Sequence, residues 1–172
     1  MDWTGIVFDL IDMRSFSNLW YWIALAVTWS SASHWVLGVP WDAVQRARRQ
    51  GGEAEADFRD LLRANVNRHL LIGSAGAPIL LVVSFVLSTL FLLGFAYGVE
   101  FAQAVFLILA PLTLVFWLAI RAARRIADGP YEAERVHRVL VRHRLAIQGI
   151  GMVSIFVTAF WGMLQNFNVS IL

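Results

Sequence analysis

Four long apolar stretches limit what this chain can fold into. They cover residues 16–37, 70–97, 101–120 and 145–164, and none contains an Asp, Glu, Lys or Arg. A helix rises about 1.5 Å per residue, so about 20 residues cross the roughly 30 Å hydrocarbon core of a bilayer. Backbone groups in hydrocarbon find no water, and we therefore expect each stretch to be helical.

The composition agrees with a membrane protein. The chain is 59% hydrophobic and 15% charged, whereas a soluble domain has about 45–50% apolar and about 25% charged residues. We therefore predict an all-α integral membrane four-helix bundle that forms a single domain over residues 1–172.

The arginines predict how the bundle is oriented. The sequence has no lysine, and thirteen of its fourteen arginines lie in two short segments, 41–69 and 121–144. Positive side chains in short loops are retained on the cytoplasmic side. Both segments are therefore predicted to be cytoplasmic loops, with the N-terminus and the C-terminus outside. The net charge of +2 is modest and gives no case for nucleic-acid binding.

Short amphipathic surface helices are expected between the spans. Apolar residues recur at helical spacing in three segments, opposite charged residues. A helix on the outer surface is predicted before the first span, one is predicted to begin near Glu53, and a third leads into the fourth span. Their apolar residues are Trp3, Ile6, Val7, Leu10 and Met13; Phe58, Leu61, Leu62 and Val66; and Val136, Val139 and Leu140.

Small residues predict where the spans pack. Gly94 and Gly98 form a G-x-x-x-G pattern, and Gly151, Thr158 and Gly162 form a strip on the fourth span. Such residues let helices approach closely within a membrane, and the contacts can be within the chain or with a partner.

Six arginines are candidate contacts for a partner protein or for membrane lipid. They occur as two clusters, one in each loop: Arg46, Arg48 and Arg49, and Arg121, Arg124 and Arg125. An arginine near an anionic membrane surface contributes about 1 kcal/mol. The alternative is that these residues serve only to orient the chain.

Three histidines are candidate haem or metal ligands. His34, His69 and His143 all fall near the inner ends of predicted spans, and two facing imidazoles can hold a b-type haem or a divalent metal. Interfacial histidines can equally form ordinary hydrogen bonds, and we predict no cofactor. The absence of cysteine excludes disulfides, thiolate-bound zinc and cysteine-ligated clusters.

The sequence resembles a family of small alphaproteobacterial inner-membrane proteins labelled "component of SufBCD complex". The resemblance is carried by the stretches IDMRSFSNLWYWIALAV, SHWVLGVPWD, QRARRQGG, YGVEFAQAVFL and GMVSIFVTAFWGM. It implies a multi-pass protein of the bacterial inner (cytoplasmic) membrane with a link to iron–sulfur cluster assembly. Without a cysteine the chain holds no cluster through thiolates, so the resemblance implies an accessory whose arginine loops are the docking surface.

The leading hypothesis is a non-enzymatic accessory or scaffold that docks a partner complex or forms a homo-oligomer. No phosphate loop, G-x-S-x-G or H-E-x-x-H motif is present, and we predict no catalytic residue. One alternative is a membrane redox protein with a b-type haem or metal. Another is a small-solute transporter, although the ionisable residues that transporters carry at depth are missing from the spans.

Overall fold

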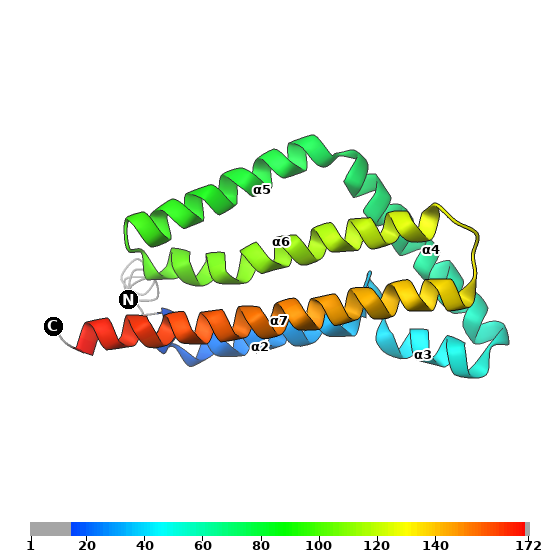
Figure 1. Cartoon of the computed structure of the whole chain (residues 1–172), viewed down its shortest axis with the longest axis horizontal. Coiled ribbons are helices and arrows are strands. Elements are labelled where there is room, and N and C mark those ends of the chain that lie inside the picture. The colour runs from blue at the N-terminus through cyan, green and yellow to red at the C-terminus, as the bar shows by residue number, and fades with distance from the viewer. Residues whose placement is uncertain (1–14, 171–172) are drawn as a thin grey trace, which may run out of the picture.

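The computed structural model describes residues 15–170, with side chains to Phe167, and shows an elongated helical molecule (Figure 1). A two-stranded hairpin interrupts the helices near the start. The elements in order are η1 (Ser15–Ser17), α2 (Leu19–His34), β1 (Trp35–Val36), β2 (Val39–Pro40), α3 (Trp41–Gln50), α4 (Gly52–Ser74), α5 (Gly76–Phe91), η2 (Leu92–Ala96), α6 (Glu100–Ala127) and α7 (Ala133–Ser170). The all-α class is confirmed.

Within residues 15–170, three helical segments are long and apolar enough to span a membrane: Gly76–Ala96, Glu100–Ala127 and Ala133–Phe167. They correspond to the second, third and fourth predicted spans. The first predicted span, 16–37, contains the shorter helix α2 of 16 residues, whose length is about 24 Å at 1.5 Å per residue. The predicted surface helix at residues 3–13 lies outside the described residues.

The end of the first predicted span is a hairpin and not a helix. Trp35 pairs with Pro40 and Val36 pairs with Val39 in antiparallel register. The turn between them has positive φ at Leu37 (56°) and Gly38 (75°), as a two-residue turn of the primed type requires. Leu37 tolerates this backbone because its side chain is buried against the core.

The second predicted span, 70–97, is not one continuous helix. Helix α4 runs from the first loop to Ser74, and α5 begins at Gly76. Pro78 has no N–H to donate to the carbonyl of Ser74, and its ring crowds that carbonyl, so the chain bends here. Helix α5 then passes into the π-type turn η2 before the chain returns as α6 (Figure 1).

The second predicted loop, 121–144, is mostly helical. Helix α6 continues to Ala127, and α7 begins at Ala133 and runs without a break through the fourth predicted span. The loop between these two helices is therefore much shorter than the sequence suggests, and the arginines on either side of it sit on rigid helices.

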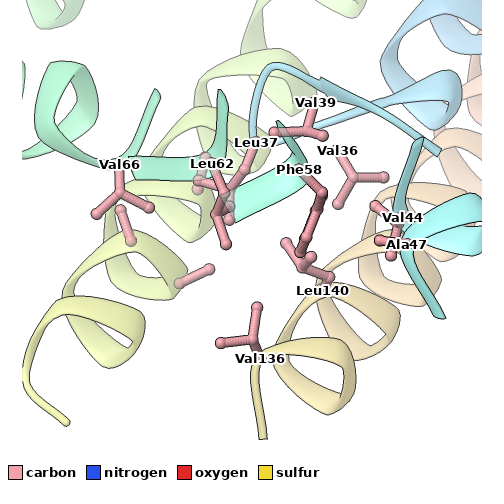
Figure 2. Packing of buried hydrophobic residues seen from close by; sticks show 13 residues of the cluster. Val36, Leu37, Val39, Val44, Ala47, Phe58, Leu62, Val66, Val136 and Leu140 are labelled. Carbon is pink, nitrogen blue, oxygen red and sulfur yellow. The ribbon is translucent and has the colours of Figure 1, made fainter. Parts of the chain in front are cut away.

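The main hydrophobic core lies at the end of the molecule that carries these arginines. The apolar stripe of α4 packs on small residues of α6, on the start of α7 and on the hairpin (Figure 2). Leu61, predicted to belong to the stripe, is 41% exposed. The core residues are Val36, Leu37, Val39, Val44, Ala47, Phe58, Leu62, Val66, Ala119, Ala122, Ala123, Val136 and Leu140.

The apolar segments bury fewer side chains than the arginine-rich end does. Helix α5 has no buried residue. It lies nearer to α6 at the end that joins η2 and further from α6 at the end that joins α4 (Figure 1). Its exposed leucines, valines and phenylalanines are typical of a surface that faces lipid.

The position of Leu140 in the core predicts that shortening its side chain lowers the stability of the protein strongly. This side chain is fully buried, so Leu140→Ala is expected to lower the free energy of unfolding by about 2–5 kcal/mol. Chemical unfolding in mild detergent, followed by circular dichroism, measures the change. Leu145→Ala on the same helix is the control, because Leu145 is 61% exposed; an equal loss in both variants would contradict the assignment of the core.

Candidate functional site

The candidate site is the arginine-rich end, which comprises α3, residues 52–69 of α4, residues 121–127 of α6 and residues 133–144 of α7. Eleven of its thirteen arginines are exposed, and Arg135 and Arg144 are half-buried. Among residues 15–170, the ion pairs are Asp42 with Arg46 (3.4 Å) and Asp42 with His34 (3.7 Å). Most of the guanidinium groups therefore have no carboxylate partner within the described chain.

Helices α3 and α7 contact each other through aromatic rings and guanidinium groups. The Arg144 guanidinium lies 4.3 Å from the centre of the Trp41 ring, and Trp41 stacks on His137 at 6.1 Å. The Arg48 Nη1 atom lies 3.0 Å from His137 Nε2. Arg48, predicted to bind a partner, is thus partly engaged within the chain, and the cation–π contact at Trp41 adds to the rigidity of this end.

A second aromatic contact joins α4 to the loop before α7. The Arg59 guanidinium lies 4.4 Å from the centre of the Tyr131 ring. Burial, reinforced by the negative charge of Glu55, raises the pKa of Tyr131, and Arg59 opposes this change. A cavity of about 160 Å³ lies beside Tyr131 and is also lined by Arg48, Glu55 and His137. Its small volume is below the usual range for a small-molecule site.

The arginines of α6 lie on two sides of the helix. Arg121 and Arg125 are four residues apart and line the same cavity beside α7, and the Arg121 guanidinium lies 4.3 Å from the centre of the Trp117 ring. Arg124 lies on the side of α6 that faces α4, near Gly73. The carbonyl of Arg125 accepts a hydrogen bond from the Arg135 side chain. The three residues therefore do not form one contact patch, although they are close together in the sequence.

The three candidate histidines occupy different surroundings. His34 is exposed at the end of α2 beside Asp42 of α3. His69 is half-buried, with Nδ1 2.8 Å from the carbonyl oxygen of Asn65, whereas His143 is buried and close enough to His69 to sense its charge. In the described part of the chain, no group of three or more His, Cys, Asp or Glu side chains is arranged to hold a metal.

The small residues of the spans make close contacts at four of the five predicted positions. A Cβ atom added at Gly151 would lie 2.8 Å from Trp29 of α2, and one at Gly162 would lie 3.2 Å from Phe16. Thr158 is fully buried on the same strip, and a Cβ atom at Gly94 would lie 2.9 Å from Gln103.

Gly98 does not pack as predicted, because nothing lies within 4 Å of a Cβ atom placed there. Its φ of 74° places it in the turn before α6. Glycine meets that turn's need for a left-handed backbone conformation.

Gln103 connects η2, α6 and α7 at the end of the molecule opposite the arginines, and the sequence did not indicate this role. Its side chain is buried and donates from Nε2 to the carbonyl of Gly94 at 2.8 Å. Its Oε1 accepts from Trp161 Nε1 and from Gln165 Nε2, each at 2.9 Å. Glu100, one turn before it, accepts the backbone N–H of Phe16 at 2.8 Å. A glutamine inside the apolar stretch 101–120 was the sequence signal that could have indicated this role.

Comparison of the chain with models of protein families, with curated proteins and with solved structures finds no match. The arrangement of the site is therefore interpreted from its own residues.

The hydrogen bonds of Gln103 predict that Gln103→Leu lowers the free energy of unfolding by about 1–3 kcal/mol. The variant leaves the Gly94 carbonyl and the Trp161 indole N–H without their hydrogen-bond partner in a site that water does not reach. Thermal unfolding in detergent, followed by tryptophan fluorescence, measures it. Gln148→Leu on α7 is the control, since no hydrogen bond of the Gln148 side chain is found within residues 15–170. Equal stability of the wild type and Gln103→Leu would refute the role.

Proposed function

We propose that the chain crosses the bacterial inner membrane four times, with its arginine-rich end in the cytoplasm and both termini outside. The positions of the ends of α2 support the fourth crossing. The segment η1, just before α2, forms hydrogen bonds at the end of the molecule opposite the arginines. Phe16 bonds to Glu100 at the start of α6, and Ser17 bonds to Asn166 near the end of α7. Helix α2 then ends at the hairpin that packs into the arginine-rich end. It therefore extends between the same two ends as α6 and α7.

Single cysteines test this orientation cleanly, because the chain has none of its own. In intact spheroplasts, Tyr97→Cys and Ser17→Cys are expected to react with a membrane-impermeant maleimide, since the turn before α6, where Tyr97 is exposed, and the start of α2 lie outside. Gln50→Cys is expected to react only after the membrane is opened. Protection of Ser17→Cys with labelling of Tyr97→Cys would show that α2 does not cross.

We propose further that the chain is a non-enzymatic accessory that docks an acidic surface of a cytoplasmic partner. The observation that carries this proposal is a packed helical end whose exposed guanidinium groups, apart from that of Arg46, form no ion pair with a carboxylate of residues 15–170. Arginines held on rigid helices lose little conformational freedom on binding, and their planar groups suit carboxylates. On α3, Arg46 and Arg49 are exposed and lie clear of the Arg48–His137 contact; Arg46 pairs with Asp42 at 3.4 Å, whereas Arg49 forms no ion pair within residues 15–170.

The family resemblance names the first partner to test, the SufBCD complex of iron–sulfur cluster assembly. The chain would contribute a membrane attachment for that complex and not a cluster ligand, because it contains no cysteine. This role asks only for a cationic surface and a membrane anchor, which are the two features the sequence carries most clearly.

Co-purification in mild detergent tests the docking. The wild type is expected to retain its partner, with SufBCD subunits identified by mass spectrometry. Arg46→Gln/Arg49→Gln is expected to lower recovery about fivefold, since two exposed charge pairs at about 0.5 kcal/mol each sum to about 1 kcal/mol. Gln45→Ala/Gln50→Ala on the same helix is the uncharged control. A chain recovered alone, or equal recovery with both double variants, would contradict the proposal.

A further inference from the structure

Two cavities lie along the seam between α6 and α7, and their linings differ in kind. One, of about 390 Å³, lies at the arginine-rich end and is lined by Arg121, Arg125, Arg142 and His143. The other, also about 390 Å³, lies further along the seam and exposes no polar surface. Its lining includes Leu107, Pro111 and Leu114 of α6 and Gly149, Val153 and Val157 of α7.

The two cavities open on the same face of the helix pair. On α6 the lining residues 107, 111, 114, 118, 121 and 125 recur every three or four positions, which places them on one stripe of a helix. On α7 the residues 139, 142, 146, 149, 153 and 157 recur in the same way. The face is separate from the α4 contact of α6, where Phe116 meets His69 and Ile120 meets Gly73. The cationic pocket therefore lies in line with the apolar groove, on the same side of the helix pair.

The cationic pocket is not neutralised by the chain. Arg121, Arg125 and Arg142 are exposed, and none forms an ion pair with a carboxylate of residues 15–170. No Asp or Glu is among the residues that line the pocket. Three unpaired guanidinium groups around one opening favour an anion, and guanidinium groups match phosphate geometry well.

The length of the groove fits one acyl chain. From Leu118, beside the arginines, to Phe106 at the far end of the groove is twelve residues of α6, or about 18 Å along the helix. One leaflet supplies about half of the roughly 30 Å hydrocarbon thickness. A molecule with an anionic head and an apolar tail of this length is a phospholipid.

We propose that the α6–α7 seam is a binding site for an anionic phospholipid of the inner leaflet. Its phosphate lies among Arg121, Arg125 and Arg142, and one acyl chain lies in the groove beside Pro111 and Gly149. A helix of a partner protein would fill the apolar groove but would leave the three guanidinium groups unmatched. The site rests on the proposed orientation, in which the arginine-rich end faces the cytoplasm, and it is independent of partner docking through α3.

Lipid titration of delipidated protein in detergent tests the site. Dioleoyl phosphatidylglycerol is expected to raise the melting temperature in a saturable way, and dioleoyl phosphatidylcholine and inorganic phosphate at equal concentrations are not. Replacing Arg121, Arg125 and Arg142 with Gln is expected to weaken binding of phosphatidylglycerol about fivefold for each arginine removed. Because these side chains are exposed, the lipid-free melting temperature should be unchanged.

Two further variants separate a built site from diffuse attraction. Arg63→Gln/Arg68→Gln/Arg138→Gln removes the same charge from exposed positions elsewhere at this end and is expected to leave binding intact. Gly149→Leu places a side chain in the groove, where nothing lies within 4 Å of a Cβ atom, and is expected to lose phosphatidylglycerol binding while every arginine remains.

Each contrary outcome overturns the proposal in a different way. Equal weakening by the two triple variants would show attraction by overall charge. An equal shift with inorganic phosphate would show a site for a soluble anion, and full binding by Gly149→Leu would show that no acyl chain enters the groove.

Discussion

Packing of the α4 stripe on α6 and α7 is the interaction on which the rest of the structure depends. Phe58, Leu62 and Val66 belong to one buried cluster with the small residues Ala119, Ala122 and Ala123 of α6, whose size lets α4 approach closely. Helices in water are driven together by burial of apolar surface, whereas helices in lipid associate through small residues and hydrogen bonds. The contacts of Gly151 with Trp29 and of Gln103 with Trp161 are of the second kind. The rigid part of the molecule is therefore the part that carries the charge.

That rigidity turns a run of arginines into surfaces with different properties. Helices α6 and α7 extend beyond the predicted span ends, so their arginines project at defined angles around the helices and not from a flexible loop. Arg121 and Arg142 lie beside the same seam, whereas Arg124 faces α4. On α3, Arg48 is drawn into the contact with His137 while Arg49 stays exposed. Neighbours in sequence thus serve separate surfaces.

Much of the architecture could be predicted because its causes are local. Long apolar stretches and helical periodicity depend on residues close in sequence, and they indicated the spans and the stripe through Phe58 and Leu62. The hairpin at residues 35–40 was missed because Leu37 adopts its strained turn only when α4 covers it. Gln103 was missed for a similar reason: its three partners come from η2 and α7, up to 62 residues away. Gly98 was assigned to packing because G-x-x-x-G does not distinguish a contact from a turn.

The sequence by itself determined that the chain is helical, apolar and charged with arginine in two segments, because hydrophobicity and charge are properties of the residues themselves. It also determined that no thiolate chemistry is possible, because there is no cysteine. Only the tertiary structure decided which arginines share a pocket and which histidine is buried. It also decided that the cationic pocket and the apolar groove lie on the same side of α6 and α7. These properties depend on the rotation of α6 and α7 about their axes, which is set by contacts with α2 and α4 that no local pattern contains.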